Sequence, residues 1–115
     1  MKIFTLLGLS LFLSTQSLDA TSSGFTKLGS ELHEQYQAYL RVERNWGKKG
    51  DLITGTAYSS YIQGVLDANN EIDHPKNVTL GQIYAIVGKF LVNNPELLHN
   101  NAALLIETAI KRAFK

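Results

Sequence analysis

Few residues in this chain of 115 could do chemistry: there are three histidines, ten acidic side chains and no cysteine. His33 and Glu34 begin a pattern like the one that binds zinc on a helix of metalloproteases, but position 37 is Gln, so the second histidine is missing. His74 and His99 share no ligand spacing with His33. The absence of cysteine excludes thiol catalysis and every cysteine-based metal site. We expect no metal and no cofactor.

The chain also lacks an arranged nucleophile. Ser59 and Ser60 have no glycine-flanked elbow around them, and no glycine-rich loop that could cradle a phosphate is present. Asp67, Glu71 and Asp73 could form a carboxylate pair, although acids at a helix end and in a loop are more commonly a solvated surface. The sequence therefore predicts no catalytic residues, and we expect a protein that is not an enzyme.

Charge and composition narrow the class of partner. Eleven basic and ten acidic side chains leave a formal charge of +1, which is too balanced for the broad cationic field of a non-specific nucleic-acid binder. With 44% hydrophobic residues, 115 positions can bury one modest core. We expect a single domain and no nucleic-acid partner.

The N-terminus is typical of a signal peptide. Lys2 precedes an apolar run over residues 3–13, which is too short to span a bilayer, and small residues follow it. An amphipathic or buried first helix is the alternative, but the run has no polar face. Cleavage after Ser17 is possible, and cleavage after Ala20 is favoured. We expect residues 1–20 to be removed on export, leaving one domain over residues 21–115 with no membrane span.

Apolar spacing predicts that the first half of this domain is helical. Residues 26–44 repeat apolar positions at steps of three and four, and two glycines break the pattern over residues 45–51. In that predicted loop Trp46 lies beside Lys48 and Lys49, a weak indication of an anionic partner.

A second predicted helix, capped by Thr54 or Thr56, extends to about Asn69. Gly64 lies inside it, and since glycine costs a helix about 1 kcal/mol relative to Ala, we expect a neighbouring backbone to pack closely there.

Start signals for helices dominate the second half. Residues 69–77 are polar and contain a proline, which indicates a surface loop. Thr79 and Gln82 fit a capping box, and the apolar pattern then continues to about Asn93. Asn94-Pro95-Glu96 indicates a new start, and residues 99–101 could cap a further helix, so the last segment is one helix or two. We expect an all-α, cysteine-free bundle of about four principal helices.

Two tyrosine pairs share helix faces by their spacing. Tyr36 and Tyr39 are three apart on the first predicted helix, and Tyr58 and Tyr61 are three apart on the second. Tyrosine rings suit either a core edge, with the hydroxyls reaching solvent, or a partner interface. The core edge is the favoured interpretation.

The C-terminal half carries short motifs that are individually weak and together fairly specific. In chain order they are Tyr61-Ile62-x-Gly64-Val65-x-Asp67, Pro75, Val78-Thr79-x-Gly81-Gln82, Phe90-Leu91-x-x-Asn94-Pro95-Glu96, Leu98-His99 and Ala113-Phe114. In this order and spacing, residues 58–115 resemble the periplasmic immunity proteins of type VI secretion amidase effectors, the Tai-type family.

This resemblance implies a small periplasmic helical protein that binds a peptidoglycan-cleaving amidase and blocks its active site, commonly as a homodimer. The chain departs from the family at the cysteines: family members commonly carry them near the positions that here hold residues 58–60, Asp73 or His74, and Lys115. Packing must then supply what a disulfide would add, about 2 to 4 kcal/mol per bridge. A cysteine-free domain of this size also favours self-pairing.

Contact with an enzyme cleft is best sought in an exposed loop. We expect it in the loop over residues 69–77, whose polar side chains can pair with active-site groups; the predicted partner-binding residues are Glu71, Asp73, His74, Lys76 and Asn77. The alternative function is a small periplasmic helical chaperone or structural protein, which would offer an apolar surface to unfolded clients.

Overall fold

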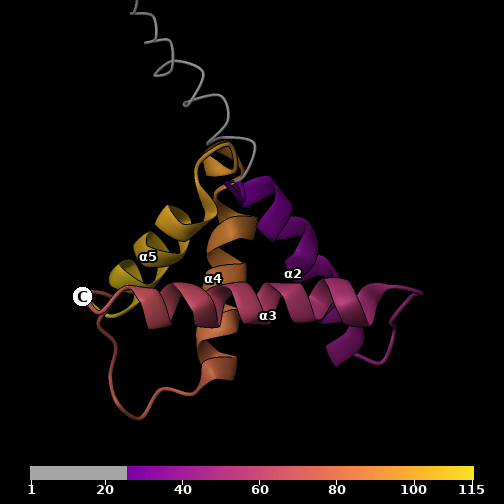
Figure 1. Ribbon diagram of the computed structural model, residues 1–115, viewed down its shortest axis with the longest axis horizontal. Coiled ribbons are helices and arrows are strands. Elements are labelled where there is room, and N and C mark those ends of the chain that lie inside the picture. The colour runs from indigo at the N-terminus through magenta and orange to yellow at the C-terminus, as the bar shows by residue number, and fades with distance from the viewer. Residues whose placement is uncertain (1–25) are drawn as a thin grey trace, which may run out of the picture.

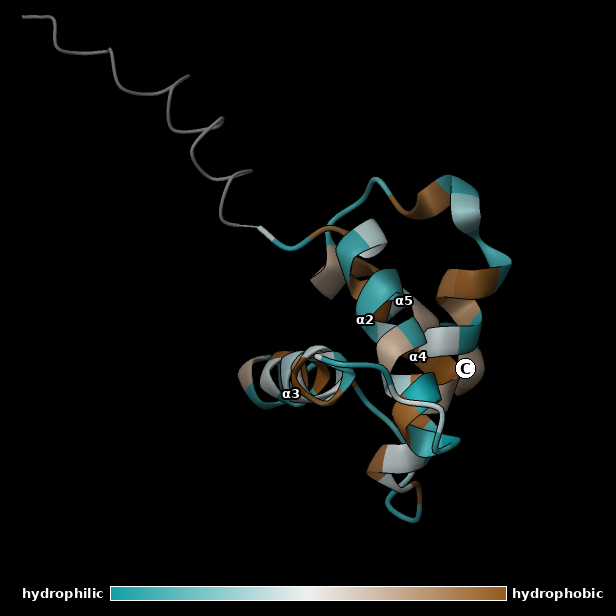
Figure 2. Ribbon diagram, turned by 90° about the vertical axis from the view of Figure 1, so that its right-hand side faces the viewer, coloured by the Kyte–Doolittle hydropathy of each residue, from teal (hydrophilic) through white to brown (hydrophobic). Residues whose placement is uncertain are grey.

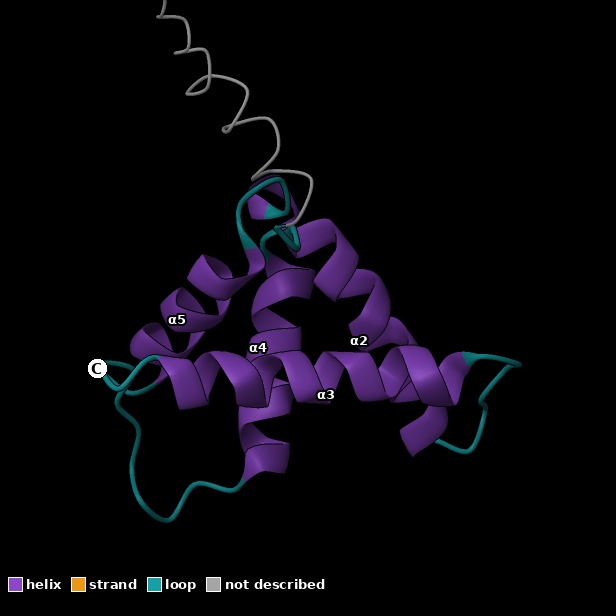
Figure 3. Ribbon diagram, in the orientation of Figure 1, coloured by secondary structure: helices purple, strands orange, loops and turns teal. Residues whose placement is uncertain are grey.

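The computed structural model describes residues 26–115, and this part of the chain is all-α, as predicted. The elements are α2 (Gly29–Glu43), α3 (Asp51–Ala68), α4 (Leu80–Asn93), the short 3-10 helix η2 (Pro95–Leu97) and α5 (Ala102–Ala113) (Figure 1). Within residues 26–115 the secondary structure is helix and loop, without a strand (Figure 3). The expected signal peptide lies outside the described residues.

The helices form two layers. α3 crosses in front of the other helices in Figure 1, and in Figure 2, turned by 90°, it stands apart from α2, α4 and α5. Its main packing partner is α2, while α4 packs chiefly on α5. One side of α3 therefore faces the bundle and the other side is left to solvent.

All four α-helices contribute to one core. Its largest fully buried side chains are Leu32, Tyr58, Ile62, Ile83, Val87, Leu91, Ile106 and Ile110. On α3 the buried positions recur at three- and four-residue steps, which places them on the face turned toward α2. The four helices therefore share a single core in the described part of the chain.

Glycines allow close approach at three described positions, and none is the predicted one. A Cβ on Gly29 of α2 would overlap Cδ1 of Leu105. A Cβ on Gly55 of α3 would lie 2.9 Å from the Cα of Tyr39, so α2 and α3 meet backbone to backbone there. A Cβ on Gly88 of α4 would overlap the ring of Tyr36. Around Gly64 there is nothing within 4 Å, so the expectation of close packing at Gly64 is wrong.

The start of α3 also corrects the prediction. The helix begins at Asp51 rather than at a cap on Thr54 or Thr56, because Gly50 adopts a left-handed conformation with φ of 87° and turns the chain into the helix. The carboxylate of Asp51 lies in the first turn, where a negative charge is favoured by the helix dipole.

The remaining helix starts follow the sequence signals more closely. Thr79 and Gln82 form the predicted capping box at the start of α4. The last segment is two elements: η2 begins at Pro95, and the side chain of Asn101 accepts from two backbone N–H groups to cap α5. The side chain of Asn94 does not cap η2; it donates to the carbonyl of Phe90, 2.8 Å away.

The first and last helices are joined where they begin. The N–H of Gly29 donates to the carbonyl of Asn100 (2.8 Å), and the N–H of Ser30 donates to that of Leu98 (2.9 Å). In the reverse direction the N–H of Ala102 donates to the carbonyl of Lys27 (2.9 Å). This strap ties the start of α2 to the start of α5.

Candidate functional site

The loop between α3 and α4 is held to the bundle by one apolar side chain. Ile72 is only 6% exposed and belongs to the core. Its N–H donates to the carbonyl of Asn69, and the N–H of Glu71 donates to the side-chain oxygen of the same residue. Glu71 and Asp73 flank Ile72 and are both exposed. The buried isoleucine thus fixes two carboxylates on the surface.

The second part of the loop turns at Pro75. The carbonyl of Pro75 accepts from the N–H of Val78 (3.2 Å) and lies 3.1 Å from Nδ1 of the half-buried His74. Lys76 and Asn77 are exposed. All five predicted partner-binding residues are therefore accessible, and His74 is the one that the loop itself orients.

Three of these five residues meet the end of α5. Glu71, Asp73, His74 and Pro75 form one wall of an open hollow of about 460 Å³. The opposite wall consists of Lys111, Phe114 and Lys115. In Figure 1 the C-terminus lies close to the end of α3 from which the loop leaves. Lys76 and Asn77 do not line this hollow.

Sequence reasoning missed the C-terminal wall, because about forty residues separate it from the loop. Ala113-Phe114 was the one signal present, as the last of the motifs that carry the family resemblance. Phe114 also lines a second, mainly apolar hollow with Val78, Gln82, Ala85 and Ile86. Its ring therefore joins a charged depression to an apolar one.

Charges of opposite sign face each other across the charged hollow. Nζ of Lys111 lies 2.6 Å from Oε2 of Glu107, and this contact, with a smaller contribution from Glu71, raises the pKa of Lys111. The lysine accordingly stays protonated at neutral pH. The two walls thus carry opposite charges, with acids on the loop and the amines of Lys111 and Lys115 at the C-terminal end.

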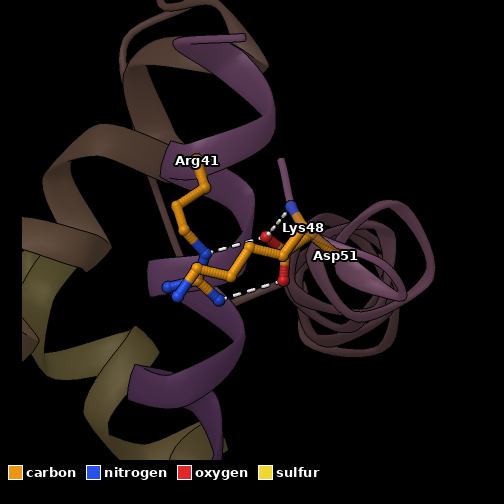
Figure 4. Close-up of polar contacts among 3 residues, drawn as sticks. All are labelled: Arg41, Lys48 and Asp51. Carbon is orange, nitrogen blue, oxygen red and sulfur yellow. Dashed lines mark hydrogen bonds and ion pairs between the residues drawn. The ribbon is translucent and has the colours of Figure 1, made fainter. Parts of the chain in front are cut away.

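A second polar cluster joins α2 to α3 (Figure 4). Arg41 donates two hydrogen bonds to Asp51, at 2.7 and 2.9 Å, and the backbone N–H of Lys48 donates to the same carboxylate at 2.7 Å. These bonds lower the pKa of Asp51 to about 2, with that to Arg41 having the largest effect. The cluster fixes the loop over residues 44–50 between the two helices.

The tyrosines gather in the interior rather than at an interface. Tyr36, Tyr39, Tyr58 and Tyr84 form ring contacts with centroids between 5.2 and 6.4 Å apart. The hydroxyl of Tyr58 does not reach solvent: it donates to the carbonyl of Tyr84, 2.5 Å away, and burial raises its pKa far above the usual value. It therefore does not act as a base. The core interpretation is right, and a buried hydroxyl replaces the expected exposed one.

Tyr61, the fourth tyrosine of the two pairs, lies apart from this cluster. It is half-buried, and Nζ of Lys27 lies 5.0 Å from the centre of its ring. Tyr61 lies at the edge of the bundle and packs against the core.

Within residues 26–115 no group of three or more metal-binding side chains converges. Residues 28–115 match the family model of the Rap1a immunity proteins. The chain belongs to the Rap1a family. This is a type VI effector immunity family and not a family of enzymes, in agreement with the absence of catalytic motifs from the sequence.

The Rap1a match extends over the whole described bundle, from the residue before α2 to the C-terminus. It includes the loop, the wall from α5 and both hollows. No curated protein and no solved structure matches the chain significantly. No helix in the described part of this Rap1a protein is both long enough and apolar enough to cross a membrane.

Proposed function

We propose that this Rap1a family member is a periplasmic immunity protein that binds a type VI secreted peptidoglycan amidase and blocks its active site with the loop over residues 69–77. The main support for contact through this loop is the hollow between the loop and the C-terminal end of the chain, which three of the predicted contact residues line. Effector binding follows from the family. The amidase is supported by the ordered motifs, and the periplasm by the N-terminal signal sequence.

The loop is prepared for such contact. Ile72 anchors it in the core, so Glu71 and Asp73 are held outward without the entropy cost of ordering a free loop on binding. A carboxylate can accept hydrogen bonds from donors in an enzyme cleft, and His74 can donate or accept. Polar groups presented in this way provide specificity more than affinity.

The neighbouring apolar hollow provides affinity. Val78, Ile86 and Phe114 line it beside the loop, and an effector side chain seated there would be removed from water. Protein interfaces commonly combine such an apolar centre with a polar rim. The loop and this hollow together form a surface of that kind.

We also propose that the protein pairs with itself. The mature domain is small and has no cysteine, so pairing with a second copy would stabilise it by burying more apolar surface. Leu104 on α5 and Val92 on α4 are large apolar side chains left about half exposed, and they are candidates for coverage by a partner subunit.

The decisive experiment is co-expression in the periplasm with the proposed partner, a cognate type VI amidase effector. The wild-type protein should prevent lysis. The combined variant Glu71→Ala, Asp73→Ala, His74→Ala and Lys76→Ala should not prevent it, although the protein remains folded by circular dichroism. Lysis despite the wild-type protein would overturn the proposed function.

A matched control separates the loop from the surface in general. Glu34→Ala with Lys89→Ala removes exposed charges from α2 and α4, away from the loop, and should protect as well as the wild type. If the loop variant protects equally well, inhibition does not pass through residues 69–77 and the placement is wrong.

A further inference from the structure

We infer that residues 44–53, at the opposite end of α3 from the loop, form a second contact surface for the effector and fit an acidic face with an apolar centre. The inference rests on the effector binding proposed above, but not on the effector being an amidase. We refer to residues 44–53 as the α3 tip.

The α3 tip carries the most exposed large apolar side chains in the described chain. Trp46, Leu52 and Ile53 are 69%, 68% and 79% exposed, and they lie within eight residues of one another. In Figure 1 this segment forms the free end of α3, where the loop extends beyond the bundle. Single exposed apolar residues are ordinary, whereas three together mark an interaction site. Tryptophan is also the residue type most enriched among side chains that dominate binding energy.

The charge around these side chains favours a partner surface that is acidic. Arg44, Lys48 and Lys49 are exposed, and Glu43 is the exposed acid beside them. Asp51 is already engaged by Arg41, so it does not neutralise the lysines. The α3 tip therefore has a net positive charge, and a surface that covers it must provide carboxylates to avoid a loss of complementarity.

The tip is rigid before any partner arrives. The N–H of Trp46 donates to the carbonyl of Arg41 at 2.7 Å, and the N–H of Lys48 donates to Asp51. Asn45 and Gly50 complete the two bends with positive φ of 60° and 87°. A side chain presented on an ordered loop costs less entropy on binding than one on a mobile loop.

The local shape favours a protein over a lipid surface. Beside Leu52 there is a groove of about 170 Å³ between α2 and α3, lined by Tyr39, Val42, Glu43, Leu52, Gly55, Thr56 and Ser59. A groove of this size can seat a side chain of a partner. Leu52 and Ile53 are consecutive on a helix, so they point about 100° apart. A contoured protein face can contact both of them and fill the groove, whereas a lipid surface cannot fill the groove with a fitted side chain.

One effector can reach both ends of α3. The helix has 18 residues and is about 27 Å long, and an ordinary interface of about 800 Å² per partner is about 30 Å across. The ends differ in charge, because the acids Asp67, Glu71 and Asp73 lie at the C-terminal end, where Lys111 and Lys115 stand on the opposite wall of the hollow. The effector should then present carboxylates to the tip and cations to the loop, which fixes its orientation.

The test measures binding of the purified cognate effector. Trp46→Ala should weaken the affinity at least about 30-fold, as expected for a dominant interface side chain. Lys48→Glu with Lys49→Glu should slow association about tenfold, and the effect should shrink at high salt. Lys89→Glu and Glu34→Ala, which change exposed charges elsewhere on the surface, should leave binding unchanged.

The outcomes separate the alternatives. Wild-type affinity in both tip variants, while the wild type binds, would overturn this inference and leave the proposed function intact. No binding by the wild type would overturn the proposed function and the inference with it. Vesicles of phosphatidylglycerol and phosphatidylethanolamine test the lipid alternative: binding that is lost in Trp46→Ala would assign the tip to a membrane surface and overturn the effector contact.

Discussion

Arg41 and Asp51, ten residues apart, form a two-point ion pair across the junction of α2 and α3, with Nε to Oδ2 at 2.7 Å and Nη2 to Oδ1 at 2.9 Å. Two parallel hydrogen bonds fix the guanidinium and the carboxylate in one relative orientation. The last turn of α2 is thereby positioned against the first turn of α3, and the loop that carries Trp46 is held between them.

This ion pair should make the stability of the folded protein depend on pH in the acidic range. Asp51 has a pKa of about 2 in the folded protein against 3.8 for the free side chain. The stabilisation is therefore fully present above pH 4 and is lost as the pH falls from about 4 to about 2. Asp51→Asn should lower the thermal midpoint at pH 7 and reduce its decline between pH 4 and 2. An unchanged decline in this variant would assign acid sensitivity to other carboxylates.

The glycines of α3 should respond in opposite directions to alanine. Gly64 has open space around it, so Gly64→Ala should stabilise the protein by about 0.5 to 1 kcal/mol through helix propensity. Gly55→Ala places a Cβ 2.9 Å from the backbone of Tyr39 and should destabilise by about 1 to 3 kcal/mol. Urea unfolding of the two variants measures both signs. Stabilisation by both would mean that α2 and α3 are not in close contact.

Tyr58 should make the protein sensitive to alkali. Burial raises its pKa well above 10.0, so above about pH 10 the unfolded chain loses this proton while the folded chain keeps it. Stability therefore falls as the pH rises through that range. Tyr58→Phe should reduce the fall and cost about 1 kcal/mol at pH 7 for the lost hydrogen bond to Tyr84. A fall as steep as in the wild type would place the responsible group elsewhere.

Self-association has a direct measurement. Light scattering of residues 21–115 at micromolar concentration should give the mass of two chains. Leu104→Glu puts a charge on an exposed apolar position of α5 and should shift the mass toward one chain, while Glu34→Ala should not. A wild-type mass of one chain would refute the homodimer.

Local signals in the sequence predict most of the fold. The amphipathic spacing before residue 44 predicts α2, and Thr79 with Gln82 predicts the start of α4, because a capping box acts within four residues. The start of α3 is different. It depends on Gly50 in a left-handed turn and on Arg41 ten residues away, and neither propensity nor periodicity contains that contact.

One part of the candidate site could be predicted from the sequence and the other part could not. A polar stretch with a proline predicts the loop, so its exposed residues could be identified from the sequence alone. The apposition of Glu71 to Lys111 and Phe114 depends on how α5 packs, and no local pattern encodes it. The same holds for Gly64, whose surroundings could be known only once the neighbours of α3 were placed.

The strap between the starts of α2 and α5 has a consequence for the order of folding. The first residues of α2 find their partners in Leu98 and Asn100, about seventy positions later. Closing so long a separation is slow compared with forming a helix hairpin. α2 and α3 can pair early, but the N-terminal turn of the domain is completed only when the final segment arrives. In a chain truncated before residue 98, the first turn of α2 would lose these hydrogen-bond partners and fray. Loss of the C-terminal segment should therefore destabilise the start of α2.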